Sequence, residues 1–151
     1  MMKQDRRRIT IVLVALILLA AMIRVAFAAL PRLVRWDEAA YVMIGKSLLA
    51  GQGYAELAGT PDLQQPPLVA LLSALGLRMG LPIPWAAAAL SYVLFGSLIV
   101  IPVFAIAREF YSLKIAAIAG VLVAIYPALA VSPLYWGTMT EPPYLLGVLG
   151  A

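Results

Sequence analysis

Two adjacent carboxylates, Asp37 and Glu38, stand near the start of the stretch WDEAAYVMIGKSLLAGQGY, just beyond the first long apolar run. A carboxylate in this position can take a proton from a hydroxyl as a general base, or it can coordinate a cation. Tyr41 follows Asp37 by four residues, so a helix would place both on one face. The chain of 151 residues contains no cysteine and no histidine. Within this sequence, thiolate chemistry, disulfides and imidazole catalysis are therefore excluded.

A structural explanation of the acidic pair stays open. Asp is a favoured helix N-cap, and Glu suits the first turn of a helix. Apolar residues at helical spacing follow, and Gly51 and Gly53 end the pattern. The sequence therefore predicts an amphipathic helix over residues 38–50, about three turns long, which suits a membrane interface better than a crossing.

The composition indicates an integral membrane protein. Hydrophobic residues make up 64% of the chain and charged residues only 12%, whereas about a quarter of the residues in a soluble domain are charged. The net charge of +4 does not indicate nucleic-acid binding, because the basic residues form no stripe with interleaved aromatics. Four of them, Lys3 and Arg6 to Arg8, cluster before the first apolar run, which is typical of a membrane-topology signal.

Three apolar runs are long enough to cross a bilayer, since about 20 helical residues suffice. They are residues 9–30, 84–107 and 115–135, and a further run begins at residue 144. Residues 66–80 are too short to span, because the roughly 13 apolar residues in them would reach only about 20 Å as a helix.

Arg24 interrupts the first apolar run near its outer end. We expect its long side chain to extend to the membrane interface. The basic start, the apolar run and the triplet Ala26-Phe27-Ala28 also fit a cleaved signal peptide. The length of the run and the later spans favour a retained first span.

Basic residues predict the orientation. Residues 1–8 and the short connection 108–114 both carry basic side chains, so the positive-inside rule places both in the cytoplasm. An even number of crossings must separate them, which leaves residues 66–80 as a non-spanning helix on the outer face. Asp37, Glu38 and Glu141 then emerge on the same outer side.

The sequence thus predicts an all-α polytopic membrane protein with outer-face juxtamembrane helices in its first loop. Its expected segments are a cytoplasmic N-terminus (1–8), a first span (9–30), an outer loop (31–83) with the amphipathic helix 38–50 and the short apolar helix 66–80, a second span (84–107), a cytoplasmic loop (108–114), a third span (115–135), an outer loop (136–143) and the start of a fourth span (144–151). An aromatic belt is expected at Tyr54, Trp85, Tyr135 and Trp136.

The order of motifs carries a family resemblance. D-E-x-x-Y follows the first span, Q-P-P-L opens the short apolar helix, the second span ends in A-R-E-F-Y, and the third ends in S-P-L-Y before T-E-P-P. From about Ile9 to its end, this succession resembles the N-terminal part of the GT-C glycosyltransferases. The most similar branch is the bacterial family related to dolichyl-phosphate-mannose protein mannosyltransferases and to the aminoarabinose transferases of lipid A.

The resemblance implies an activity and its place. A sugar would move from a polyprenyl-phosphate donor to a glycan, lipid or protein acceptor on the outer face of a bacterial or archaeal plasma membrane. Such a donor already carries a good leaving group, so the enzyme mainly positions it, deprotonates the acceptor and neutralises the departing phosphate. The partners would be membrane lipids and the lipid-linked donor, with no nucleic acid.

The resemblance also implies site residues. Asp37 matches the first outer-loop acid, which the resemblance implies is the catalytic base, with Glu38 beside it. Glu141 matches an acid after the third span, and Glu38 and Glu141 would shape the site or help to hold a divalent metal if the reaction uses one. A solvated loop acid before Pro142 is the structural alternative for Glu141.

Four further residues are candidates for binding the substrate and its phosphate: Arg35, Tyr41, Lys46 and Gln65. Gln65 stands where the family often has a lysine, and it offers a hydrogen bond without charge. For the two basic residues, contact with lipid headgroups is the alternative.

Two other function classes stay open at this stage. One is a transporter segment. In a transporter, acids are expected at mid-depth in the spans, whereas the acids of this chain lie at the outer boundary. The other is a non-catalytic assembly subunit whose acids only cap helices. The last apolar run stops at Ala151 without a polar tail, so we expect a fragment of a longer enzyme that is inactive alone.

Overall fold

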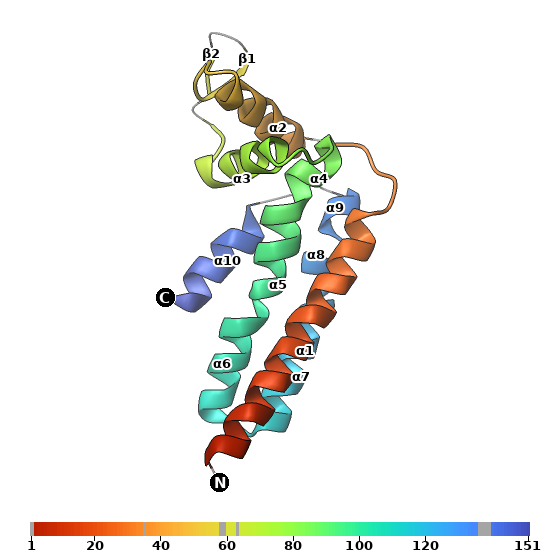
Figure 1. The fold of residues 1–151 in the computed structure, drawn as a ribbon, viewed down its shortest axis with the longest axis vertical. Coiled ribbons are helices and arrows are strands. Elements are labelled where there is room, and N and C mark those ends of the chain that lie inside the picture. Colours follow the sequence, from red (N-terminus) through yellow and green to blue (C-terminus); the bar gives the residue numbers. More distant parts are fainter. Residues whose placement is uncertain (1, 35, 58–59, 63, 136–139) are drawn as a thin grey trace.

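The computed structural model describes the whole chain except residues 1, 35, 58–59, 63 and 136–139, and it is mostly helical (Figure 1). The elements in chain order are α1 (Met2–Ala28), α2 (Trp36–Leu49), β1 (Ala55–Leu57), β2 (Thr60–Pro61), α3 (Pro67–Arg78), α4 (Ile83–Ala88), the π-helix η1 (Ala89–Phe95), α5 (Gly96–Leu98), α6 (Val100–Phe110), α7 (Leu113–Ile125), α8 (Pro127–Ala130), α9 (Ser132–Tyr135) and α10 (Glu141–Gly150). The predicted helical class is confirmed, apart from the small antiparallel hairpin of β1 and β2.

The long axis of the molecule is formed by α1, by the continuous helix from α4 to α6, and by α7 (Figure 1). Small residues lie where these helices meet, and Leu16 packs with Val100 and Phe104 in the core. Gly120 lets α7 approach closely, since a Cβ built there would lie 2.6 Å from the Cδ1 atom of Leu16. Small residues at such contacts allow close helix packing.

Within the part of the chain that the structure describes, two helices are long and apolar enough to cross a membrane, Asp5–Ala28 and Ile83–Phe110. Their outward surface is strongly apolar: on α1, Ile11, Leu18 and Met22 are each more than half exposed. The hydropathy of the sequence predicted both helices, because length and apolar content are properties that the chain shows directly.

The run expected to form a single helix over residues 115–135 is interrupted. The helix α7 ends at Ile125, and Tyr126 leaves the helical region with φ −57° and ψ 119°. Pro127 explains the break, because a proline pushes the preceding residue toward extended backbone and supplies no N–H to continue the helix. Two single-turn helices, α8 and α9, complete the segment.

The expectation that Arg24 extends to an interface is wrong, because its side chain is fully buried in the bundle. Its Nη1 atom donates to the carbonyl oxygens of Ala20 at 3.2 Å and Ala124 at 3.3 Å. The last carbonyls of a helix have no intrahelical partner, and a cation near them is favoured by the helix dipole. The end of α7 at residue 125 therefore explains why the guanidinium turns inward.

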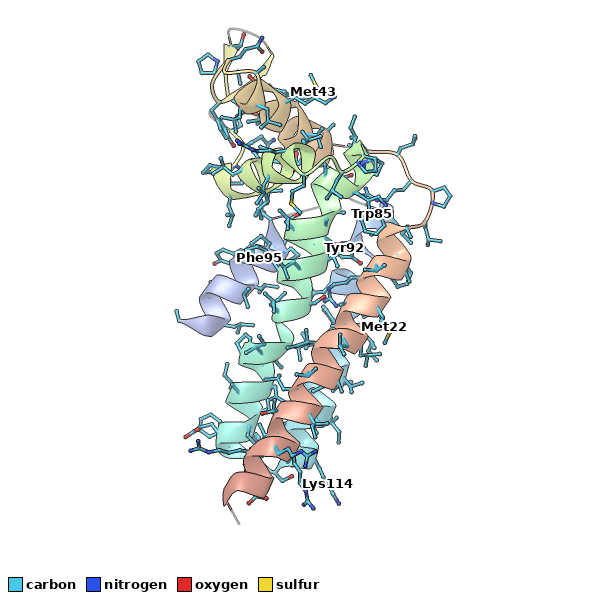
Figure 2. The ribbon with its side chains drawn as sticks, in the orientation of Figure 1. Met22, Met43, Trp85, Tyr92, Phe95 and Lys114 are labelled. Atoms are coloured by element: carbon cyan, nitrogen blue, oxygen red, sulfur yellow. The ribbon has the colours of Figure 1, made fainter. Side chains whose placement is uncertain are left out.

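A π-helix widens the second long helix beside Arg24. Tyr92 in η1 packs against Ala28 of α1, and its hydroxyl donates to the carbonyl of Ala130 at the end of α8 (Figure 2). Directly after η1, a Cβ on Gly96 would lie 2.7 Å from the Nε atom of Arg24. The π-helix and its flanking glycine thus make room for a buried arginine, and π-segments often mark functional positions.

The helices α2 and α3 lie across one end of the bundle, and the N-terminus lies at the other end with the α6–α7 connection (Figure 1). Tyr41 and Ile44 of α2 pack against Val69 and Ala70 of α3. Both helices fall close to the residue ranges that the sequence suggested, and Pro67 begins α3 at a position where proline needs no hydrogen-bond partner.

Adding a methyl group at Gly45 is expected to destabilise this end of the molecule. A Cβ there would lie 2.9 Å from the backbone nitrogen of Ala74, so α2 and α3 must separate. We expect Gly45→Ala to lower the free energy of unfolding by about 1–3 kcal/mol, the range for overpacking, although alanine favours helix formation. Thermal unfolding in detergent measures this effect.

The matched control is Gly147→Ala in α10, where a Cβ meets nothing within 4 Å. The helix preference for alanine alone should make this variant neutral or slightly more stable. Equal unfolding midpoints for the two variants would contradict the close packing of α2 on α3.

Candidate functional site

Asp37 lies in the first turn of α2 and is exposed. The helix begins at Trp36, so Asp37 stands inside the first turn rather than before the helix. There it still interacts favourably with the helix dipole. Its exposure leaves the carboxylate open to a molecule that approaches the α2–α3 end of the bundle.

Tyr41 lies one turn after Asp37 and is 3% exposed. Its pKa is raised to about 12, first by burial and then by the charges of Asp37, Tyr54, Glu141 and Asp62. Tyr41 therefore keeps its proton near neutral pH and can act as a hydrogen-bond donor.

Glu141 begins α10, more than a hundred residues after Asp37, yet its charge acts on Tyr41. The two prolines that follow, Pro142 and Pro143, are buried in the first turn of α10 and fix this start against the rest of the molecule. The fold therefore brings Asp37, Tyr41 and Glu141 into one electrostatic neighbourhood.

Glu38 has a different environment from its neighbour. It is fully buried, and its two carboxylate oxygens accept hydrogen bonds from Arg32 at 2.5 and 2.8 Å. Arg32 also donates to the carbonyl of Pro84 at 3.2 Å. This forked ion pair ties the connection after α1 to the starts of α2 and α4. It also occupies both oxygens of Glu38, the second residue of the predicted catalytic pair.

Sequence reasoning missed Arg32. The segment Pro31-Arg32-Leu33-Val34-Arg35 contains two arginines before the acidic pair, and nothing in their spacing shows which one pairs with Glu38. Arg35 was the candidate for a phosphate, and it lies outside the residues that the structure describes. Trp136 of the expected aromatic belt also lies outside them.

Gln65 is held through its backbone. Its N–H donates to the Oδ1 atom of Asp62 at 2.9 Å, and its carbonyl accepts from the hydroxyl of Tyr54 at 2.9 Å. Burial, with the charge of Asp62 second, raises the pKa of Tyr54, which favours the protonated hydroxyl that this bond needs. These contacts fix the loop just before α3.

Lys46 is not brought to Asp37. It is exposed in the last turn of α2, and nine residues of helix separate the two by about 14 Å along the axis and about half a turn around it. A phosphate close to Asp37 would therefore need a different cation.

A divalent metal would need several oxygen ligands close together. Across the described ranges, no three acidic side chains gather closely enough to hold an ion. Glu38 is engaged by Arg32, whereas the charges of Asp37, Glu141 and Asp62 all act on Tyr41. The divalent metal that the resemblance implies stays a prediction.

The raised pKa of Tyr41 predicts a dependence of stability on alkaline pH. Since the pKa in the fold, about 12, exceeds the ordinary value of 10.0, the stabilising contribution is fully present below pH 10. It is lost as the pH rises toward 12, because the unfolded chain releases the proton more readily. We expect the unfolding midpoint of Tyr41→Phe to fall less over that pH window than the midpoint of the unmodified protein.

Tyr144→Phe is the control, because Tyr144 is 67% exposed. Its midpoints should follow those of the unmodified protein across the whole window. Parallel curves for Tyr41→Phe and the unmodified protein would contradict the assignment of the alkaline transition to Tyr41.

Comparison of the chain with family models, curated proteins and solved structures finds no match. The functional argument therefore rests on the site itself. An exposed carboxylate, a buried hydroxyl that stays protonated and a second acid from α10 can together accept a proton from a hydroxyl and orient the group that carries it.

Proposed function

We propose that the protein is a GT-C-type glycosyltransferase that moves a sugar from a polyprenyl-phosphate donor to an acceptor hydroxyl on the outer membrane face. The exposed Asp37 in the first turn of α2, one turn before the buried Tyr41 and at one end of an apolar bundle, carries this proposal. A second acid, Glu141 at the start of α10, also acts on Tyr41.

The apolar surface supports insertion in a membrane. Two helices have the length and composition of spans, and their exposed faces are apolar. The start of α1, the helix whose first turns carry Arg6 to Arg8, lies at the same end as Lys114, opposite α2 and α3 (Figures 1 and 2). In the proposed orientation that end is cytoplasmic, following the positive-inside rule, and the acidic neighbourhood faces outward.

In the proposed reaction, Asp37 takes the proton of the acceptor hydroxyl while its oxygen forms a bond to the anomeric carbon of the sugar. The bond from that carbon to the phosphate oxygen breaks, and the polyprenyl phosphate leaves with the electron pair. Tyr41 donates a hydrogen bond that orients Asp37 or the acceptor, and Glu141 limits the space beside them.

Sugar transfer by membranes containing the protein at its full natural length tests the proposal. Radiolabelled sugar is supplied on a polyprenyl phosphate or on a nucleotide, and the acceptor fraction is counted. We expect transfer from the polyprenyl donor that exceeds that of membranes lacking the protein. Absence of this excess with every polyprenyl-linked sugar tried would contradict the proposed function.

A further inference from the structure

Exposed basic side chains gather at the end of the bundle where α1 starts and where α6 is connected to α7. They are Arg6 to Arg8 in the first turns of α1, Arg108 in the last turn of α6 and Lys114 in the first turn of α7. The exposed acids of the same segments are Asp5 and Glu109. Basic charges outnumber acidic ones there, so this surface attracts anions. We call this set of basic residues the basic end.

The packing of three helices brings the basic end together. Ile9 of α1, Ala107 of α6 and Leu113 of α7 all pack against the same core cluster. Each of these apolar residues is the neighbour in the chain of a basic residue of this set. The start of α1 and Lys114 lie at one end of the molecule (Figures 1 and 2). The basic end is therefore one surface to which three helices contribute.

Exposed aromatic side chains lie among these charges. Phe110, the last residue of α6, is 74% exposed, and Tyr111 after it is 58% exposed. Arg108 is held beside them, because its Nη1 atom donates to the carbonyl of Tyr111 at 3.1 Å. Exposed aromatic residues next to basic ones are typical of a membrane interface. This composition favours a lipid surface over a soluble anion as the partner.

The depth of the basic residues agrees on all three helices. On each helix an exposed apolar side chain lies within one turn of a basic residue, and these apolar residues are Ile11 on α1, Ile106 on α6 and Ile115 on α7. In a membrane, such apolar side chains belong to the hydrocarbon core and basic ones to the headgroup layer beside it. All three helices thus present their cations at the depth of lipid phosphate groups.

We propose that the basic end binds the phosphate groups of anionic phospholipids. Guanidinium groups form paired, charge-assisted hydrogen bonds with phosphate oxygens, and an ammonium group adds a point charge. Basic residues beside a membrane surface each strengthen the attraction to anionic lipids. A zwitterionic lipid also carries a phosphate, but its own cation cancels the net charge. The inference rests on insertion in a membrane and does not depend on sugar transfer.

The test is lipid binding by the purified protein in detergent micelles. Phosphatidylglycerol or phosphatidylcholine with the same acyl chains is added, and the unfolding midpoint is followed. Ligands that bind the folded state raise this midpoint. We expect phosphatidylglycerol to raise it more than phosphatidylcholine does, and we expect the difference to shrink at high salt, because salt screens exposed charges. An equal shift with both lipids would overturn the proposal.

Variants assign the binding to the basic end. Arg108→Gln combined with Lys114→Gln spares the N-terminal arginines, which also guide insertion. This double variant is expected to bind phosphatidylglycerol about 25-fold more weakly, from about fivefold for each charge. Arg108→Lys keeps the charge and should keep the affinity. Arg78→Gln is the matched control, because Arg78 is an exposed basic residue in the last turn of α3. Unchanged affinity in the folded double variant, or an equal loss in Arg78→Gln, would overturn the proposal.

Soluble anions test the choice of a lipid. Inorganic phosphate at matched ionic strength and a short single-stranded oligonucleotide are each added without lipid, and we expect both to raise the midpoint less than phosphatidylglycerol does. An equal shift with inorganic phosphate would indicate a site for free phosphate, and an equal shift with the oligonucleotide would indicate a nucleic-acid surface. Either result would overturn the proposal.

The inference and the proposed function can fail separately. Lipid binding that depends on Arg108 and Lys114, in a protein that transfers no sugar, would support this inference and contradict the proposed function. Sugar transfer by a protein whose midpoint responds equally to both lipids would do the reverse.

Discussion

Replacing Glu38 with alanine is expected to lower the free energy of unfolding by about 3–5 kcal/mol, the cost of breaking a buried ion pair by removing one partner. Glu38 is fully buried and accepts two hydrogen bonds from Arg32. Without it, Arg32 would keep its bond to Pro84 but would lose its counter-charge while its side chain stays 3% exposed. Thermal and denaturant unfolding of the purified protein in detergent measures the loss.

Two further variants show whether the loss comes from the unpaired charge. Glu109→Ala removes an exposed acid at the far end of α6 and should change stability by less than about 0.5 kcal/mol, as surface substitutions usually do. The double variant Arg32→Met with Glu38→Leu removes both charges and should recover most of the stability, since apolar pairs often replace buried ion pairs at little cost. A double variant as unstable as Glu38→Ala would point to lost packing instead.

The long helices were predictable from the sequence because their cause is local. An apolar run of bilayer length favours a helix wherever the chain folds in lipid, and both long helices follow from that rule. The interruption at Tyr126 follows from Pro127, which is visible in the sequence but does not change the hydropathy of the run. Counting apolar residues therefore predicted one helix where backbone geometry gives three.

The buried arginines were not predictable, because their partners lie far away along the chain. Arg24 turns inward to reach the carbonyl of Ala124, one hundred residues later, at a helix end that hydropathy does not reveal. An arginine near the end of an apolar run usually extends toward water. Only the packing of α7 and η1 against α1 shows that this one does not.

The acidic pair illustrates the same limit at two neighbouring positions. Successive helical residues point about 100° apart, so Asp37 and Glu38 have different surroundings, and Glu38 is the one that turns toward the protein. The sequence could not tell which, because the answer depends on Arg32. Spacing did correctly place Tyr41 one helical turn from Asp37, and the approach of Glu141 depends on the tertiary fold.

Replacing Asp37 with asparagine is expected to reduce the initial rate of sugar transfer by about 10²–10⁴-fold, the contribution of a positioned general base. Asparagine keeps the shape of the side chain and its hydrogen bonding, but its amide does not take up the proton of the acceptor. Asp37 is exposed, so its loss from the first turn of α2 should cost only about 0.3–1 kcal/mol of stability. The transfer assay and an unfolding curve on the same preparation measure the two effects.

The difference between these two effects separates catalysis from a structural role. Serine at position 37 removes only a favourable interaction with the helix dipole, so Asp37→Ser should keep the fold and lose transfer, whereas a purely structural Asp37 would tolerate serine in both measurements.

Glu56→Gln removes an exposed acid from β1 on the same part of the molecule and should transfer sugar at the rate of the unmodified protein. If Glu56→Gln lost as much activity as Asp37→Asn, the general negative charge of this end would be responsible. If Asp37→Asn kept full activity, Asp37 would be a helix-start residue, and the base would have to be sought elsewhere.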